Sequence, residues 1–150
     1  MDITYEIKDF DSLTTVELYE IMRLRQEVFI VEQDCPYQDA DSKDQHCHHV
    51  LGWGDGQLHT YARLVPKSVS YADYTSIGRV ITSAALRRKG YGQPLMQRSI
   101  EAINKLYPGE SIKISAQVYA VPFYNRLGFV AKGEKYLEDD IPHIAMYLKC

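Results

Sequence analysis

The chain has 150 residues, of which 45% are hydrophobic and 25% charged, a composition typical of one folded domain rather than of a disordered chain. Its formal net charge of −3 argues against a nucleic-acid-binding protein, whose binding domain is normally basic. No stretch reaches about 18 consecutive apolar residues, and the first residues lack the parts of a signal peptide, so we expect neither a membrane span nor secretion. Three cysteines in such a chain predict reduced thiols and a cytoplasmic location.

Hydrophobic periodicity predicts an α+β fold with a mixed sheet. The expected elements are strand 3–8, a helix from 15 to about 29, strands 50–53 and 58–65 around a glycine turn, strand 76–82, helix 95–106, strand 111–118, short helix 121–127, and strands 129–137 and 143–149. Thr14 and Glu17 form the capping-box pattern that begins the first helix. Most neighbouring strands can pair antiparallel, but the two strands joined through helix 95–106 must run parallel.

A basic, glycine-containing turn lies between strand 76–82 and the next helix. It reads Arg87-x-x-Gly90-x-Gly92. Backbone N–H groups of such a turn, together with the positive end of the helix dipole, favour a bound phosphate, and glycine allows the phosphate close to the backbone. The turn matches neither the P-loop nor the dinucleotide-binding pattern, and by itself an ordinary solvated loop explains it equally well.

A second segment makes the pattern more specific, because Phe123-Tyr124 and Gly128-Phe129 follow a strand that ends at Ala116-Gln117. In this order the sequence resembles the GNAT superfamily of acyl-CoA-dependent N-acetyltransferases, and the resemblance to its ElaA-type family covers nearly the whole chain. The segments that carry it are Arg25-x-x-Val28-Phe29-Ile30-Val31-Glu32-Gln33-x-Cys35-Pro36-Tyr37, Asp39-x-Asp41, Tyr61-Ala62-Arg63-Leu64, Ile77-Gly78-Arg79-Val80, Ala116-Gln117, Phe123-Tyr124, Gly128-Phe129 and Ile141-Pro142-His143-Ile144. Two positions depart from the superfamily pattern: Ala84 stands where many members have proline, and Arg88 where glycine is frequent.

The resemblance implies a single three-layer domain over residues 1–150, with three to four helices around a mixed, mostly antiparallel sheet. It implies that this sheet opens near residues 80–82 to admit acetyl-CoA as co-substrate, with no metal. The residues expected to bind acetyl-CoA are Val80, Ile81, Thr82, Arg87, Arg88, Lys89, Gly90, Tyr91, Gly92, Gln93 and Asn125.

Acyl transfer to an amine needs three chemical groups. A backbone N–H near residues 80–82 can stabilise the developing oxyanion. Tyr124 stays protonated at neutral pH and can serve the leaving thiolate. The proton of the amine needs an acceptor, for which Glu32, Glu138 and His143 remain open as candidates.

Two acidic stretches have two readings, plain solubility or a rim that attracts a cationic amine. They contain Asp34, Asp39, Asp41 and Asp44 in one loop, and Glu138, Asp139 and Asp140 near the C-terminus. We expect Glu138 and Asp139 to contact the acceptor. Three arginines lie among apolar residues, Arg25, Arg63 and Arg79, and we expect a structural role for them, with these acids as candidate partners.

The resemblance predicts an N-acetyltransferase for a primary amine of a small molecule or peptide, and it leaves a homodimer open. The cysteines and histidines between residues 35 and 59 have no spacing typical of a metal site. Two alternatives remain open: a non-catalytic acyl-CoA-binding sensor, and an acyltransferase similar to acyl-homoserine-lactone synthases. The phosphate-binding turn disfavours the latter, and Tyr124 disfavours the former.

Overall fold

The computed structural model describes residues 1–149. Its helices are α1 (Thr15–Arg25), α2 (Gly92–Leu106) and α3 (Val121–Arg126), with a π-helix η2 (Gln26–Glu32) and 3-10 turns η1 (Phe10–Ser12), η3 (Asp44–His46), η4 (Ala84–Leu86) and η5 (Val118–Ala120). Its strands are β1 (Thr4–Asp9), β2 (His48–Gly54), β3 (Gln57–Val65), β4 (Ser76–Thr82), β5 (Ile112–Gln117), β6 (Val130–Ala131), β7 (Tyr136–Glu138) and β8 (Ile141–Leu148). This is the expected α+β fold.

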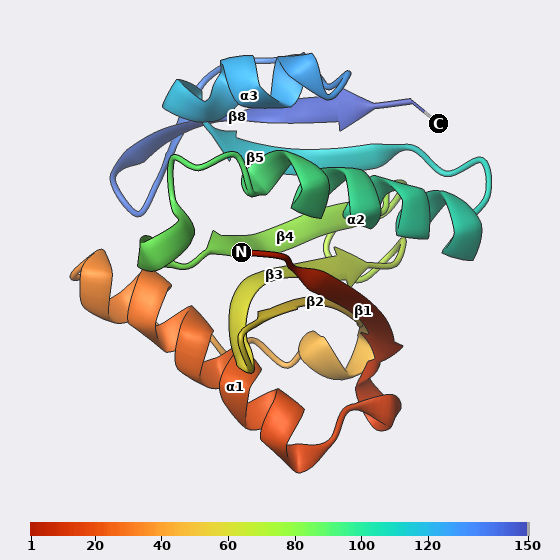
Figure 1. Ribbon diagram of the computed structural model, residues 1–150. Coiled ribbons are helices and arrows are strands. Elements are labelled where there is room, and N and C mark those ends of the chain that lie inside the picture. Colours follow the sequence, from red (N-terminus) through yellow and green to blue (C-terminus); the bar gives the residue numbers. More distant parts are fainter. Residues whose placement is uncertain (150) are drawn as a thin grey trace.

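The strands form two four-stranded antiparallel sheets (Figure 1). The first has the order β1-β2-β3-β4, and in the second β8 pairs with β5, β6 and β7. Helices α1 and α2 cover opposite faces of the first sheet, because Leu51 and Ile81 pack with α1 whereas Val50 and Ile77 pack with α2. The α2 side continues over the second sheet, where α3 also packs, so the molecule has three layers.

Strands β4 and β5 run parallel but meet only at one end. Thr75, just before β4, donates from its N–H to Ser111 O at 3.2 Å and accepts the N–H of Lys113 at 2.9 Å. Beyond this point β4 and β5 form no ladder within residues 1–149. The parallel direction confirms the crossover argument, and the separation is the opening that the resemblance implied.

Local sequence signals set the element ends. The side chain of Thr14 accepts the N–H of Glu17, and the Glu17 carboxylate accepts the N–H of Thr14, so the capping box is confirmed. Asp55 and Gly56 both have positive φ, 50° and 76°, as the two-residue turn between β2 and β3 requires. Gly128, at φ 101°, ends α3 with hydrogen bonds back from residues 128 and 129.

Two expected elements differ. The first helix is α-helical only to Arg25 and continues as the wider π-helix to Glu32, a distinction that apolar spacing does not make. The single strand expected over 129–137 is two short strands, β6 and β7, separated by a segment that contains Gly133 at φ 90°.

Candidate active site

A cleft of about 1140 Å³ lies where β4 and β5 separate. Its walls come from η2 and the segment after it, from the far halves of β4 and β5, from α3, and from the turn between β7 and β8. Nine of the residues that the sequence analysis expected to bind or react line this cleft: Glu32, Val80, Ile81, Thr82, Arg87, Tyr124, Glu138, Asp139 and His143. The cleft therefore brings together residues that are more than 100 positions apart in the sequence.

A β-bulge interrupts β4 inside this cleft. Arg79 and Val80 both stand against Ala62 of β3, and Arg79 has φ 50°. The extra residue inverts the alternation of side chains, so Ile77 packs on the α2 side while Ile81, four residues later, packs on the α1 side. The bulge thus changes the direction of the β4 backbone at the point where β4 has no neighbour on its cleft side.

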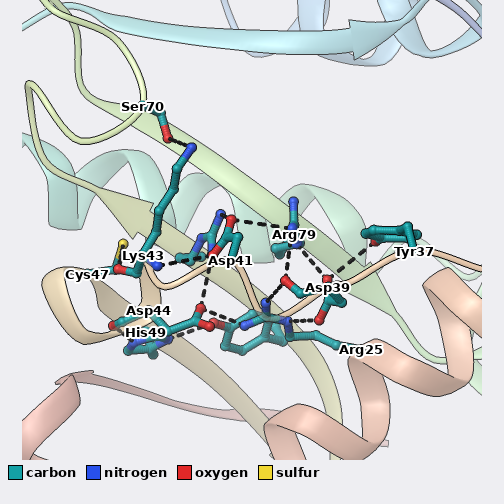
Figure 2. A network of polar contacts seen from close by, with 12 residues as sticks. Arg25, Tyr37, Asp39, Asp41, Lys43, Asp44, Cys47, His49, Ser70 and Arg79 are labelled. Carbon is teal, nitrogen blue, oxygen red and sulfur yellow. Dashed lines mark hydrogen bonds and ion pairs between the residues drawn. The ribbon is translucent and has the colours of Figure 1, made fainter. Parts of the chain in front are cut away.

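A buried ion-pair network lies behind the bulge (Figure 2). Arg79 Nε donates to Asp39 Oδ1 at 2.8 Å, and Arg25 Nε donates to Asp39 Oδ2 at 2.7 Å. Arg25 is fully buried and Asp39 is 5% exposed. The three side chains join the end of α1, the loop after η2 and the β4 bulge.

The network continues away from the cleft. Arg63 Nη1 lies 2.8 Å from Asp41 Oδ1 and 3.0 Å from Asp44 Oδ1, and Arg25 Nη1 lies 2.7 Å from the same Asp44 oxygen. Burial by itself would raise the pKa of Asp44, but hydrogen bonds from the two arginines outweigh it and hold the pKa below its ordinary value. Arg63 does the same for the pKa of Asp41.

The arginine partners are thus confirmed, and the expectation of an acidic rim is wrong for three of the four loop aspartates. Asp39, Asp41 and Asp44 neutralise arginines and do not face an acceptor as free charges. Of that loop only Asp34 lines the cleft without such a pairing.

Tyr124 lies on α3 and lines the cleft. Its ring makes edge contacts with Phe123 and Phe129, at centroid distances of 5.2 and 5.9 Å. Burial, with a smaller contribution from Tyr119, raises the pKa of Tyr124 to about 12. The hydroxyl is therefore protonated throughout the physiological range and is able to donate a hydrogen bond into the cleft.

Glu32 and Arg87, which the sequence analysis assigned to different roles, form an ion pair in the lining of the cleft. The Glu32 carboxylate lies 2.5 Å from Arg87 Nη2, and Arg87 Nε donates to the carbonyl of Thr82 at 3.1 Å. Both side chains are partly exposed. In this arrangement the carboxylate of Glu32 is already occupied by a guanidinium.

His143 lies on β8 with both ring nitrogens facing oxygen atoms. Nδ1 is 2.7 Å from the carbonyl of Ile141, and Nε2 is 3.2 Å from the carboxylate of Glu138. The ring also stacks on Tyr136. Because a carbonyl can only accept, Nδ1 carries a hydrogen, and Nε2 is the nitrogen that faces the carboxylate of Glu138 at the cleft.

The other residues that were expected to bind acetyl-CoA do not line the cleft. They are Arg88, Lys89, Gly90, Tyr91, Gly92 and Gln93 in the turn before and at the start of α2, and Asn125 on α3. Arg88 has φ 61°, a left-handed conformation that explains why glycine suits this position. A Cβ at Gly92 would lie 3.5 Å from Phe123 Cζ, an ordinary contact, so sterics alone do not require glycine there.

Sequence reasoning missed several polar groups of the cleft. They are Tyr37, Ser115, Gln117, Tyr119 and Tyr136; all but Tyr136 line the cleft, and Tyr136 contacts Ser115 and His143 there. The sequence contains twelve tyrosines, which suits half-buried positions with one polar end, but this count does not say which of them gather.

Neither a metal cluster nor a membrane-spanning helix is found in the described part of the chain. No group of three or more His, Cys, Asp or Glu side chains in residues 1–149 is placed to hold an ion. No helix among these residues is long and apolar enough to span a bilayer. Cys35 and Cys47 are free thiols, whereas Cys150 lies outside the described residues.

Comparison with known proteins assigns the family. A family model described as "Acetyltransferase (GNAT) domain" matches residues 13–150. Protein ElaA of Escherichia coli K12 is 42% identical over 136 residues, which cover 89% of this chain and 88% of that protein. The structure is similar to an acyl-CoA N-acyltransferase from Pseudomonas aeruginosa (TM-score 0.93, 44% identity, 98% of this chain and 99% of that one) and to E. coli ElaA (TM-score 0.91, 37% identity, 97% and 99%). With its sheets separated at β4 and β5, this chain belongs to the GNAT family of acyl-CoA-dependent acyltransferases, as an ElaA-like member.

Proposed function

We propose that this protein transfers the acetyl group of acetyl-CoA to a primary amine of a small molecule or peptide. The amine attacks the thioester directly. The observation that carries the proposal is that one cleft is lined by the unpaired edge of β4, by Tyr124 and by His143. The cysteine usage of the sequence supports a cytoplasmic location, which we also propose.

Binding of the co-substrate is assigned to the β4 edge and the turn that follows. Backbone N–H groups of residues 88–93 and the N-terminus of α2 bind the pyrophosphate, with Arg87 and Lys89 adding positive charge. An N–H of the edge at Val80–Thr82 donates to the thioester carbonyl and stabilises the negative charge that develops on it. Arg87 is already paired with Glu32 through Nη2, so a bound phosphate is a second anionic partner for its guanidinium.

Two side chains handle protons in this proposal. His143 Nε2 accepts the proton of the attacking amine once the half-exposed side chain of Glu138 has moved away from it, whereas the carboxylate of Glu32 is already occupied by Arg87. The carboxylate of Glu138, 3.2 Å from Nε2, then stabilises the imidazolium. Tyr124 donates a hydrogen bond to the departing thiolate.

A panel of primary amines tests this function. The protein is incubated with acetyl-CoA, propionyl-CoA or octanoyl-CoA and with cationic, neutral and peptide amines, and release of free CoA thiol is measured. We expect amine-dependent thiol release with acetyl-CoA. If calorimetry shows that acetyl-CoA binds but no amine produces thiol release above background, the protein is an acyl-CoA-binding sensor and not a transferase.

A further inference from the structure

The β4 bulge depends on a residue that does not favour its own backbone conformation. Arg79 has φ 50°, in the left-handed region that costs a side-chain-bearing residue an appreciable conformational penalty. Glycine adopts this region freely, yet here the position holds the longest cationic side chain. Other contacts must therefore hold residue 79 in place.

Most of those contacts are made with Asp39, and Arg79 Nη2 also lies 3.4 Å from Asp41 Oδ2. Besides the Nε contact to Asp39, Arg79 Nη2 donates to the main-chain carbonyl of Asp39 at 3.1 Å. Arg25 Nη2 donates to the same carbonyl, also at 3.1 Å, and Arg25 Nε to the other carboxylate oxygen. Asp39 is thus bound by two guanidinium groups through both its side chain and its backbone (Figure 2).

Asp39 also contacts a second segment that lines the cleft. The hydroxyl of Tyr37 donates to Asp39 Oδ1 at 3.3 Å, and Tyr37 lines the cleft together with Cys35 and Pro36. The Asp39 carboxylate therefore connects two segments of the cleft lining, residues 35–37 and the β4 edge. An ion pair that only stabilised the fold would not need to contact residues of the cleft, whereas both Tyr37 and Arg79 line it.

We propose that Asp39 and Arg79 are positioning residues for acyl transfer. Their ion pair keeps residue 79 left-handed, and the resulting bulge aims the edge of β4 at the thioester carbonyl. The inference rests on the proposed function, because it assigns the carbonyl to the Val80–Thr82 edge. Asp39 itself does not line the cleft, so it acts through Arg79 and Tyr37.

Two substitutions of Arg79 distinguish the effect of its backbone conformation from the effect of its side-chain ion pair. Arg79→Gly and Arg79→Ala both remove the ion pair, but only glycine adopts the left-handed conformation without cost. That conformational difference corresponds to about a 5- to 30-fold difference in the population of the bulge. We expect kcat to fall in the order parent, Arg79→Gly, Arg79→Ala, with glycine about tenfold faster than alanine, while acetyl-CoA affinity changes by less than about twofold between the two.

A matched control exists in the β2–β3 turn. Asp55 also has φ 50° but is exposed and does not line the cleft. Asp55→Gly and Asp55→Ala should differ in thermal stability as the residue 79 pair does, yet have the same kcat. Equal kcat for Arg79→Gly and Arg79→Ala, with both proteins folded by circular dichroism, overturns the proposal.

A second measurement does not depend on turnover. Acetyl-CoA should slow hydrogen–deuterium exchange of the 77–82 amides in the parent and in Arg79→Gly, and should protect them less in Arg79→Ala. Equal protection in both variants overturns the positioning role. If the parent binds acetyl-CoA but acetylates no amine, the proposed function fails while this exchange comparison still decides the positioning role. If Arg79→Ala does not fold, Asp39→Asn takes its place, with a loss of both kcat and amide protection expected.

Discussion

Replacing Tyr124 by Phe removes one hydroxyl and keeps the ring between Phe123 and Phe129. The ring contacts supply the packing of α3, so the variant should fold as the parent does. Loss of the hydroxyl also removes a polar group whose burial raises the pKa of Tyr124 to about 12. We therefore expect the free energy of unfolding to change by less than about 1 kcal/mol, in either direction.

The pKa of Tyr124 indicates how its hydroxyl can assist the departing thiolate, and therefore how much kcat should fall when the hydroxyl is removed. An ordinary thiol has a pKa of about 8.5, so full proton transfer from Tyr124 to a thiolate is uphill by about 3.5 pKa units, or about 5 kcal/mol. Tyr124 consequently acts as a hydrogen-bond donor rather than as a full acid. A hydrogen bond to a charged group contributes about 1.5 to 3 kcal/mol, so kcat should fall about 10- to 150-fold.

Steady-state thiol release at saturating acetyl-CoA and amine measures this loss, with calorimetry for acetyl-CoA affinity and urea unfolding for stability. The dissociation constant should stay within about threefold of the parent value. The parent should not lose activity through ionisation of Tyr124 between pH 7 and 10, since the hydroxyl with a pKa of about 12 remains protonated there. A Phe variant that keeps kcat within twofold of the parent would show that Tyr124 only packs α3.

Three further predictions concern the co-substrate, the acceptor and the buried network. Gly92→Asp should weaken acetyl-CoA binding measured by calorimetry, whereas the uncharged Gly92→Asn should not, because the added Cβ fits. Glu138→Gln combined with Asp139→Asn should raise KM for cationic amines and flatten its salt dependence, and should also lower kcat because Glu138 contacts His143; an unchanged KM and salt slope would show that these acids do not attract the amine. Asp44→Asn should lower the free energy of unfolding by about 3 kcal/mol, because it breaks a buried ion pair. Glu27→Gln, which breaks the exposed pair with Arg23, should lower it by less than about 0.5 kcal/mol. Urea unfolding followed by the fluorescence of the single tryptophan measures both. Since the folded-state pKa of Asp44 is depressed, its stabilisation is present above the unfolded pKa of about 3.9 and is lost as pH falls through the folded value, so Asp44→Asn should flatten acid unfolding below about pH 4.

The parts of the fold that sequence reasoning anticipated are those set by local chemistry. The capping box of Thr14 and Glu17, the turn at Asp55 and the helix end at Gly128 each follow from residues within four positions. The separation of β4 from β5 came from the resemblance, and its parallel direction from the helical connection between them.

The loop acids were expected as partners of the three arginines, but the individual pairings and the bulge that they accompany were not anticipated. The only sequence signal of the bulge is an arginine, Arg79, within an otherwise apolar strand. The partner of Arg79, Asp39, lies 40 positions earlier. The pairing of Glu32 with Arg87 spans 55 positions and joins residues assigned to different tasks. Side-chain type predicts that a buried charge has a partner, but the fold decides which one.

The acidic residues near the cleft divide into two groups with different physical roles. Asp39, Asp41 and Asp44 lie against three arginines, so their charges cancel locally and their contribution is geometric. The 138–140 turn lies at the cleft, with Glu138 half-exposed, and no arginine or lysine of residues 1–149 pairs with it. Salt screens exposed charges far more than buried pairs, so the two groups respond differently to ionic strength. We therefore expect attraction of a cationic amine to come from the acids at the cleft that no arginine of the described chain neutralises, the 138–140 turn and Asp34, and neutralising a network aspartate should change kcat or stability without changing the salt slope.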